Sequence, residues 1–196
     1  MMRPLLFAAN RGCLAGELFL MGKIVSLEEA LTVRGKLQAE GKTVVFTNGH
    51  FDLLHMGHVD YLQRARELGD VLAVGLNSDA STRALKGEKR PIVPQGERAR
   101  MLAALACVDY VIIFEETTAN SLVEALKPDL YVKGGDWAEG HISPEAEVVA
   151  SYGGQVRILP YLPEHSTTGL IETIVERFGS GEMENEGAGC QGGHGN

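Results

Sequence analysis

Two histidines, His55 and His58, stand three positions apart where a short apolar run gives way to a helical pattern. The first N–H groups of a helix have no intrahelical partner and the dipole is positive at that end, so the backbone favours an anion there. Two imidazoles at this point could donate hydrogen bonds to phosphate oxygens, and Gly57 between them would let a phosphate approach the main chain closely. The spacing therefore predicts a site for a nucleoside triphosphate.

The histidine pair is also compatible with two simpler roles. A single histidine near a helix start is most often a cap or a surface residue. A pair at this spacing could instead bind zinc, but a catalytic zinc needs a third protein ligand. The three cysteines are widely scattered and show no paired spacing: Cys13, Cys107 and Cys190. We therefore predict no protein-bound metal.

The residues on either side of the pair predict a strand and a helix. The strand is a short β-branched and aromatic run, 44–46, which stops at the turn residues Asn48 and Gly49. The helix ends at Gly69 and has apolar residues at helical spacing, namely Val59, Leu62, Ala65 and Leu68. The histidines would thus lie where a buried strand meets an amphipathic helix.

Apolar runs predict four more strands, at 71–76, 110–114, 130–132 and 156–159. Helical patterns follow a capping box of Ser26 and Glu29 and recur at 97–107, at 121–126 and up to Phe178. Strands that alternate with helices across short loops predict an α/β fold, a Rossmann-like, doubly wound parallel sheet of five strands. Ligands of such sheets bind beyond the carboxyl ends of the strands, and the absence of a GxGxxG run argues against a dinucleotide.

Basic residues gather after the second strand. The segment 83–94 has two prolines and four cations, so we expect a loop that clamps substrate anions or forms a solvated surface; the cations are Arg83, Lys86, Lys89 and Arg90. Arg98 lies in the first turn of the next helix, where a cation opposes the helix dipole at a cost of roughly 0.3–1 kcal/mol. A bound phosphate or a nearby carboxylate would offset that cost.

Polar residues also follow the strand predicted at 130–132. Paired glycines there, Gly134 and Gly135, would let a ligand approach the backbone. Lys133 and Asp136 are placed to meet a phosphate and a hydroxyl or metal, respectively. Trp137 would stack on a base or fill the core.

Three hydroxyl residues stand at the start of the last predicted helix: Ser166, Thr167 and Thr168. Such residues cap helices, and a helix start favours anions, so they predict a cap and a second anion site. The two helix starts would face one crevice.

The stretch 49–58, GHFDLLHMGH, resembles the GxFDxxHxGH signature of the cytidylyltransferase-like nucleotidyltransferases. The similarity continues in the runs KIVSLEEA, NSDASTRALKG, VKGGDW and HSTTGLI, over about Gly22 to Phe178, and is greatest to the adenylyltransferase module of ADP-heptose synthases. The resemblance implies transfer of AMP from ATP to a sugar 1-phosphate, D-glycero-β-D-manno-heptose 1-phosphate, giving ADP-heptose, a lipopolysaccharide precursor, and pyrophosphate. The alternative is a cytidylyltransferase that uses CTP and glycerol 3-phosphate or a similar phosphorylated alcohol.

The resemblance also implies a role for each matching residue. Three would be catalytic: His55, His58 and Lys86. The others would bind the nucleotide: Asn48, Gly49, Phe51, Asp52, Gly57, Arg98, Lys133, Gly135, Asp136, Ser166, Thr167 and Thr168. Mg²⁺ would enter with the nucleoside triphosphate, held mainly by the nucleotide itself. Some cytidylyltransferases carry an arginine a few residues before the Ser-Thr-Thr run; here Pro163, Glu164 and His165 occupy that region, so its role is dropped or passes to His165.

The family commonly forms dimers, so we expect a homodimer. A kinase domain is often fused to the adenylyltransferase module and is not recognised in this sequence, so we expect functional pairing with a separate sugar kinase. The competing class is a noncatalytic nucleotide-binding or regulatory module that has kept the pocket. Its sign would be loss of His55, His58 or Lys86, and all three are present.

Length and composition set the limits of these expectations. A chain of 196 residues with 44% hydrophobic content suits one α/β domain, which we place at 21–178. A formal net charge of −8 argues against nucleic-acid binding. The unpaired cysteines suit a reducing, cytoplasmic setting. No apolar run reaches the roughly 20 residues of a membrane span. We expect residues 1–20 to be an extension, with Met21 as the natural start, and 179–196 to be a glycine-rich disordered tail.

Overall fold

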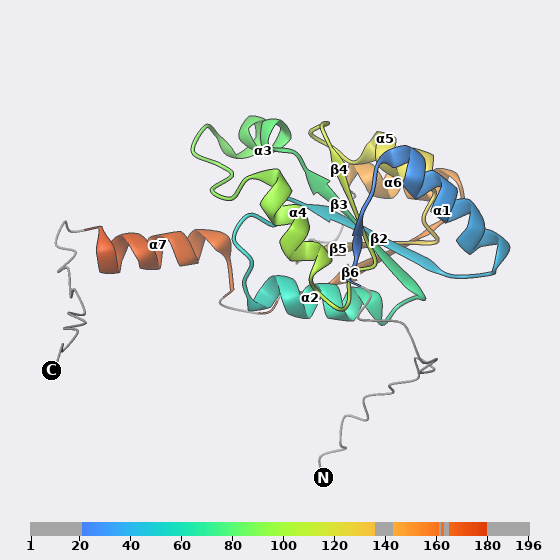
Figure 1. Ribbon diagram of the computed structural model, residues 1–196, viewed down its shortest axis with the longest axis horizontal. Helices are drawn as coiled ribbons and strands as arrows, with labels where there is room; N and C mark the ends of the chain where they lie inside the picture. The colour runs from blue at the N-terminus through green and yellow to red at the C-terminus, as the bar shows by residue number, and fades with distance from the viewer. Residues whose placement is uncertain (1–20, 136–142, 161, 163–164, 180–196) are drawn as a thin grey trace, which may run out of the picture.

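The computed structural model describes residues 21–135, 143–160, 162 and 165–179. Within these residues, six strands form one parallel sheet in the order β1-β4-β3-β2-β5-β6 (Figure 1). The strands are β1 Lys23–Ile24, β2 Val44–Gly49, β3 Val71–Asn77, β4 Tyr110–Phe114, β5 Leu130–Gly134 and β6 Gln155–Leu159. The five predicted strands and their parallel arrangement are confirmed. The predicted number is one too few, because the two-residue β1, which pairs with β4, is too short to show any period.

Helices lie on both faces of the sheet, as a doubly wound fold requires (Figure 1). They are α1 Leu27–Ala39, α2 Met56–Arg66, α3 Asp79–Lys86, α4 Gln95–Ala103, α5 Asn120–Leu126, α6 Pro144–Ser151 and α7 Thr167–Phe178. One apolar core lies between the sheet and α2 with α4, and includes Leu62 and Leu102. The other lies between the sheet and α1, α5 and α6, and includes Phe46 and Val123.

The segment 83–94, predicted as a loop, is helical in its first four residues, which end α3. Ser78 begins this helix, because its side chain accepts a hydrogen bond from the backbone N–H of Ser81 at 3.1 Å, and Gly87 ends it with a φ of 90°. The prediction is wrong here because the apolar run marks Ser78 only as the end of a strand, although serine is also a favoured helix cap. No prediction covered α6, and α4 stops before the predicted Cys107.

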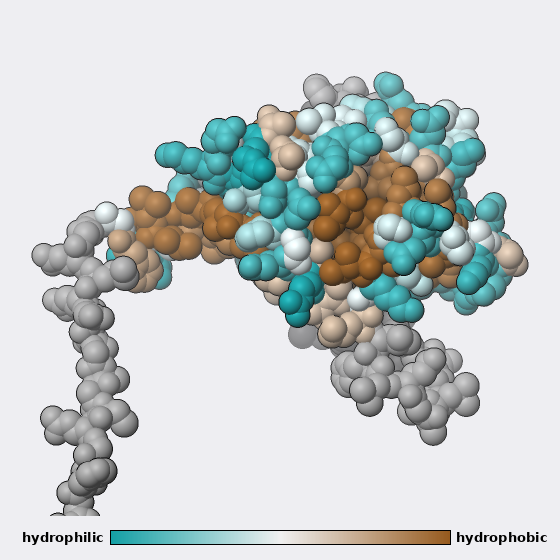
Figure 2. Space-filling view, turned by 45° about the horizontal axis from the view of Figure 1, so that its top comes forward, coloured by the Kyte–Doolittle hydropathy of each residue, from teal (hydrophilic) through white to brown (hydrophobic). Residues whose placement is uncertain are grey.

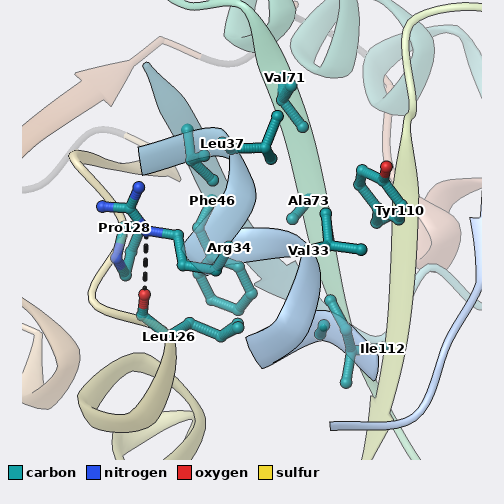
Figure 3. A pocket seen from close by; sticks show the side chains of 12 residues that line it. Val33, Arg34, Leu37, Phe46, Val71, Ala73, Tyr110, Ile112, Leu126 and Pro128 are labelled. Carbon is teal, nitrogen blue, oxygen red and sulfur yellow. Dashed lines mark hydrogen bonds between the residues drawn. The ribbon is translucent and has the colours of Figure 1, made fainter. Parts of the chain in front are cut away.

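The predicted capping box at the start of α1 is confirmed. Ser26 Oγ accepts a hydrogen bond from the N–H of Glu29, and Glu29 Oε2 accepts one from the N–H of Ser26. A small, mainly apolar pocket lies between α1 and the sheet (Figure 3). Its sheet wall includes Val44 and Val71, the first residues of β2 and β3, so the pocket lies toward the amino ends of these strands. Ligands bind at the opposite edge of such sheets, and we assign this pocket no part in binding.

The last helix, α7, extends away from the body of the domain (Figure 1), and apolar side chains follow its length (Figure 2). None of its residues is buried. Four apolar side chains are 39% to 69% exposed: Leu170, Ile174, Val175 and Phe178. Among the described residues no helix is long and apolar enough to cross a membrane. The predicted extension at 1–20 and nearly all of the predicted tail at 179–196 lie outside the described residues.

Candidate active site

The order in which the chain adds strands to the sheet reverses between β2 and β5. From β2 the chain adds β3 and β4 on one side, and it then returns to place β5 and β6 on the other. Ligands of open α/β sheets bind at such a switch point, outside the carboxyl ends of the strands. The signature residues follow β2 and Lys133 lies near the end of β5, so the topology brings the two segments to one edge. A hydrogen bond of 3.3 Å from Lys133 Nζ to Asn48 Oδ1 joins them directly.

The two signature histidines lie face to face at the start of α2. His55 is the N-cap residue, but its side chain makes no capping hydrogen bond. The His55 and His58 rings stack with their centroids 3.8 Å apart and an angle of 22° between the planes. The Phe51 ring lies 5.2 Å from the His58 ring on a tilt. The imidazoles are therefore held by each other and by Phe51, and neither is used to cap the helix.

Both imidazoles are held in the neutral form. Burial lowers the pKa of His58 to about 4, and the charge of His55 adds to the shift, while an interaction with the Leu53 main chain opposes it. Burial also lowers the pKa of His55, and His165 adds to that shift. A neutral imidazole still carries one N–H donor. The Nδ1 atom of His55 is buried and makes no hydrogen bond within the described residues, so a ligand there would meet an unsatisfied nitrogen.

Gly57 lies where the chain before α7 approaches the start of α2 closely. A Cβ atom at this position would lie 3.0 Å from the Cβ of His165 and 3.0 Å from Nδ1 of His55. The residue before the Ser-Thr-Thr run therefore packs against the start of α2. The starts of α2 and α7, which are more than a hundred residues apart in the sequence, therefore lie close together.

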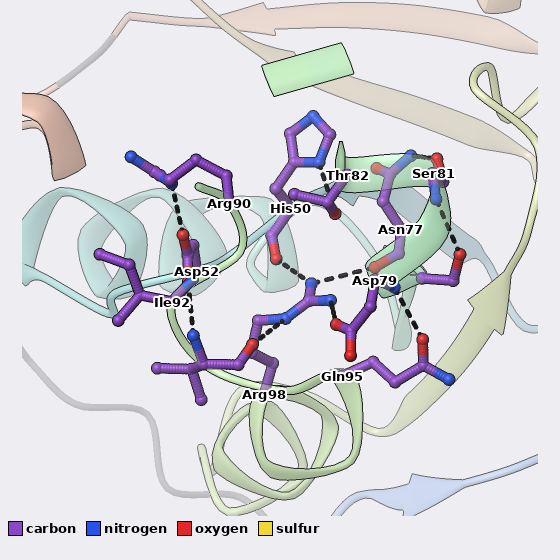
Figure 4. Close-up of polar contacts among 12 residues, drawn as sticks. His50, Asp52, Asn77, Asp79, Ser81, Thr82, Arg90, Ile92, Gln95 and Arg98 are labelled. Carbon is purple, nitrogen blue, oxygen red and sulfur yellow. Dashed lines mark hydrogen bonds and ion pairs between the residues drawn. The ribbon is translucent and has the colours of Figure 1, made fainter. Parts of the chain in front are cut away.

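A third histidine, His50, lies directly after β2 at the same edge of the sheet. Its Nδ1 is 3.1 Å from the Thr82 hydroxyl of α3 (Figure 4). Burial, followed by four nearby positive charges, lowers its pKa to about 4; in order of effect they belong to Lys86, Arg98, Lys133 and Arg90. Sequence reasoning missed His50 as a site residue. The signal was a third histidine within nine residues of the pair, but the cations around it come from four separate segments.

Two of these four cations are neutralised by carboxylates. Arg98 Nη2 lies 2.7 Å from Asp79 and Arg90 Nε lies 2.6 Å from Asp52. Lys86 is exposed at the end of α3 and has no hydrogen-bond or ion-pair partner within the described residues. The positive charge left for a ligand is therefore that of Lys86 and of Lys133. The charges of both lysines lower the pKa of His50, and a phosphate site formed by these residues stays a prediction.

Arg98 is fully buried and its donors point to protein groups (Figure 4). It donates to the carbonyl oxygens of Val93, Asn77 and His50 and to the Asp79 carboxylate. The carboxylate proposed as one way to offset its charge is therefore present as Asp79. A contact from Arg98 to a nucleotide stays a prediction.

Asp52 is also occupied by protein groups. It is 2% exposed and accepts hydrogen bonds from Arg90 Nε and from the backbone N–H groups of Ile92 and Val93, at 2.6 to 2.9 Å (Figure 4). Its neighbour Phe51 has a φ of 45°, a left-handed conformation that costs a residue with a side chain roughly 1–2 kcal/mol. The bonds of Asp52 and Arg98 tie this strained turn to the loop after α3, which indicates a positioning role.

The remaining predicted residues lie at the ends of β5 and the start of α7. Gly135 has a φ of 130°, which favours glycine, and its N–H donates to the carbonyl of Leu159. Ser166 is the N-cap of α7, because its hydroxyl accepts from the N–H of Gly169 at 3.0 Å, so the predicted cap is confirmed. Thr167 and Thr168 form the first turn.

Asp136 and Trp137 lie outside the described residues. In the described part of the chain, no three histidine, cysteine, aspartate or glutamate side chains are grouped so that they could hold a metal ion. The site therefore consists of N–H donors, two lysines and two helix starts. This is chemistry suited to anions.

Comparisons with known proteins agree with this geometry. The model of the cytidylyltransferase-like family matches residues 46–172. The bifunctional protein HldE of Geobacter sulfurreducens is 52% identical over 158 residues, and that of Pelobacter propionicus is 57% identical over 142 residues. These matches cover 80% and 72% of this chain but 32% and 29% of the relatives, so the chain spans about a third of their length. A lipopolysaccharide core biosynthesis protein from Thermoplasma volcanium is 30% identical, with a TM-score of 0.51 over 62% of this chain and 98% of that one.

Proposed function

Because the chain belongs to the cytidylyltransferase-like family, we propose that it transfers a nucleotidyl group from a nucleoside triphosphate to a phosphorylated acceptor. The observation that carries the proposal is the convergence, at the β2/β5 switch point, of two stacked neutral imidazoles, the start of α7, and two lysines that form no ion pair within the described residues. Each of these groups can bind phosphate oxygens.

In this reaction a phosphate oxygen of the acceptor attacks the α-phosphorus in line, and pyrophosphate leaves. The acceptor phosphate is already ionised at neutral pH, so no strong general base is needed. Catalysis then depends on position and on donors aimed at the charge that builds on the phosphoryl oxygens. His55 and His58 would donate to the α- and β-phosphates, while Lys86 and Lys133 would hold phosphates from the other side. Mg²⁺, held mainly by the nucleotide, would offset part of the negative charge of the triphosphate.

The substrates we propose are ATP and D-glycero-β-D-manno-heptose 1-phosphate, with ADP-heptose as the product. The relatives named HldE and the lipopolysaccharide core biosynthesis protein favour this reaction over the cytidylyl alternative. Their greater length means that the activity of the whole relatives is not carried over to this chain. A sugar kinase would supply the 1-phosphate.

The test pairs each triphosphate with each acceptor. The protein is incubated with Mg²⁺ and ATP or CTP, together with heptose 1-phosphate or glycerol 3-phosphate, and pyrophosphate release is measured. We expect release only with ATP and heptose 1-phosphate, with omission of either substrate as the control. Release confined to CTP and glycerol 3-phosphate would favour the alternative, and no release with any pair would refute nucleotidyl transfer to these acceptors.

We also propose that two copies of the chain associate through α7. Its exposed apolar side chains would gain by burial, at about 25 cal/mol per Å² removed from water. The mass of the protein in solution, measured by light scattering, tests this, and Ile174→Glu should shift it toward the monomer. Glu172→Gln, at an exposed polar position of the same helix, is the control. A monomeric wild-type protein at micromolar concentration would refute the proposal.

A further inference from the structure

His50 is held at the active-site edge through both its main chain and its side chain. Its carbonyl oxygen accepts a hydrogen bond from Nη1 of the fully buried Arg98, and its Nδ1 lies 3.1 Å from the hydroxyl of Thr82 in α3 (Figure 4). Thr82 is itself fully buried. The imidazole therefore has a fixed direction before any ligand binds, which is what a binding group in a preorganised site requires.

The contact with Thr82 selects one tautomer of the His50 imidazole. Burial lowers the pKa of His50 to about 4, so at neutral pH only one ring nitrogen carries a hydrogen. In the described part of the chain, Nδ1 of His50 is the only hydrogen-bond partner of the Thr82 hydroxyl, and a buried hydroxyl needs an acceptor for its hydrogen. The hydroxyl therefore donates to Nδ1, which leaves the hydrogen of the ring on Nε2.

The Nε2–H group of His50 is left for a ligand. Nε2 makes no hydrogen bond within the described residues, and unlike Nδ1 of His55 and of His58 it is not closed off from solvent. Figure 4 shows this end of the ring pointing away from Thr82 and from the contacts of Arg98. An oriented N–H that no protein group uses is a ready donor to a bound anion.

A cation lies one helical turn from this contact. Thr82 and Lys86 are four residues apart in α3 and so lie on the same face of the helix. Long side chains of a helix lean toward its N-terminus, so the Lys86 chain is directed back toward Thr82 and His50. Lys86 is exposed and forms no ion pair within the described residues. This face thus combines a neutral N–H donor with a positive charge, and both can bind a phosphate group.

We propose that His50 is a phosphate-binding residue of this site, which donates its Nε2–H to an oxygen of a substrate phosphate beside Lys86, and that Thr82 is the positioning residue that fixes its tautomer and direction. The inference deepens the proposed function and rests on it for the presence of two phosphate-bearing substrates. The triphosphate or the acceptor phosphate would supply the oxygen, and the test separates the two. A purely structural role for His50 would be to hold the end of β2 against α3.

His50→Asn and His50→Gln separate binding from structure. Counted in bonds from Cβ, the asparagine amide reaches as far as Nδ1 and can still meet Thr82. The glutamine amide reaches as far as Nε2 and restores an N–H donor there. Pyrophosphate release with Mg²⁺, ATP and heptose 1-phosphate, each substrate varied in turn, gives kcat and both KM values. Urea denaturation gives the free energy of unfolding.

We expect His50→Asn to raise the KM of one substrate by about tenfold or more, the effect of one lost hydrogen bond to a charged group, and His50→Gln to recover most of that loss. A rise for ATP identifies the triphosphate as the ligand of His50, and a rise for heptose 1-phosphate identifies the acceptor. Both variants should keep the wild-type free energy of unfolding. Wild-type KM values in His50→Asn, or a loss of stability without a change in either KM, would overturn the proposal.

Thr82→Val and Thr82→Ser test the positioning role. Valine keeps the shape of threonine but cannot donate to Nδ1, so Thr82→Val should lower kcat/KM by about 3- to 10-fold, the effect of one neutral hydrogen bond. Thr82→Ser keeps the hydroxyl and should stay near the wild type. Thr32→Val, at an exposed hydroxyl of α1, is the matched control and should leave the kinetics unchanged. Equal kinetics in Thr82→Val and Thr82→Ser would refute the role of Thr82.

A further measurement does not depend on turnover. Proton–nitrogen magnetic resonance spectra of the imidazoles show which ring nitrogen carries the hydrogen, and the His50 signals are identified by their absence in His50→Gln. In the wild type at neutral pH we expect the Nε2–H form, with a shift of that nitrogen when ATP or inorganic phosphate is added. The Nδ1–H form, or no shift with either ligand, would overturn the proposal. If the wild type released no pyrophosphate from any substrate pair, the proposed function would fail while this test of phosphate binding still stood.

Discussion

Gly57→Ala tests whether the contact between the start of α2 and His165 fixes the positions of the proposed catalytic side chains. The added methyl group would lie 3.0 Å from His165 Cβ and 3.0 Å from His55 Nδ1, where ordinary contacts begin at 3.4 Å. Both neighbours must give way by a few tenths of an ångström. Neither is buried in the core, since His165 is exposed and His55 half-buried, so the displacement should fall on the site and leave the fold intact.

The expected effects on activity and stability differ. A misplacement of about 1 Å in a catalytic group can cost roughly 10²-fold, so a shift of a few tenths of an ångström should lower kcat/KM by about 3- to 10-fold. For stability, alanine in place of glycine in a helix gains up to about 1 kcal/mol, while crowding costs about 1–3 kcal/mol where neighbours cannot move. With mobile neighbours the two nearly cancel. The free energy of unfolding should therefore change by only about 1 kcal/mol.

The assay compares Gly57→Ala with Gly96→Ala. Each glycine is the second residue of its helix, α2 and α4, but a Cβ at Gly96 would meet nothing within 4 Å. Pyrophosphate release with ATP and heptose 1-phosphate gives kcat and KM, and urea denaturation gives the free energy of unfolding. Gly96→Ala should keep wild-type kinetics. A well-folded Gly57→Ala protein with wild-type kcat/KM would refute the claim that this contact sets the geometry of the site.

Three further outcomes follow. His58→Ala should lower kcat by about 10²- to 10³-fold, which is the effect of losing one oxyanion donor. Gln63→Ala, on the exposed side of α2, should leave kcat unchanged. Near wild-type turnover in His58→Ala would contradict the proposed role. Burial lowers the pKa of His50 and His58 from 6.5 to about 4, so the unfolded chain binds more protons than the folded chain between these pH values. The free energy of unfolding should therefore be fully retained above pH 6.5 and fall toward pH 4. A free energy of unfolding that does not change with pH in urea titrations, or an equal slope in a variant with asparagine at both positions, would count against this prediction. Arg98→Met should lower the free energy of unfolding by about 3–5 kcal/mol, because it leaves Asp79 and three carbonyl oxygens without their donor. Arg100→Met, at an exposed position of α4, should change the free energy of unfolding little, and urea denaturation compares the two variants.

The strands and the edge that binds ligands can be predicted from the sequence, because both depend on local patterns. β4 has the predicted bounds, Tyr110–Phe114, since a strand buried on both faces needs a continuous apolar run. Parallel strands with helical crossovers place all their carboxyl ends at one edge, which is why Asn48 and Lys133 could be expected together. The hydrogen bond between their side chains follows from that topology.

The partners of buried polar groups could not be predicted in the same way. The sequence predicts that Arg98 meets either a bound phosphate or a nearby carboxylate, and the family resemblance implies that Asp52 binds the nucleotide. The structure gives Arg98 to Asp79 and three carbonyls, and Asp52 to Arg90 and two backbone N–H groups. These contacts join segments that neither period nor spacing relates. A charge at a predicted site can thus serve to hold the site's own loops.

The stacking of the histidine pair explains why their low pKa matters. Two imidazolium charges about 4 Å apart would repel by about 1 kcal/mol in water and by about 4 kcal/mol at the effective dielectric constant of a protein surface. The rings of His55 and His58 lie 3.8 Å apart, so the stack is compatible with at most one charge, and burial provides this by lowering both pKa values. In the proposed site the pair would offer a phosphate two N–H donors without mutual repulsion, while Lys86 and Lys133 would supply positive charge from separate segments. With neutral donors at the helix start and cations on other segments, an acidic chain would bind a triphosphate without placing like charges side by side.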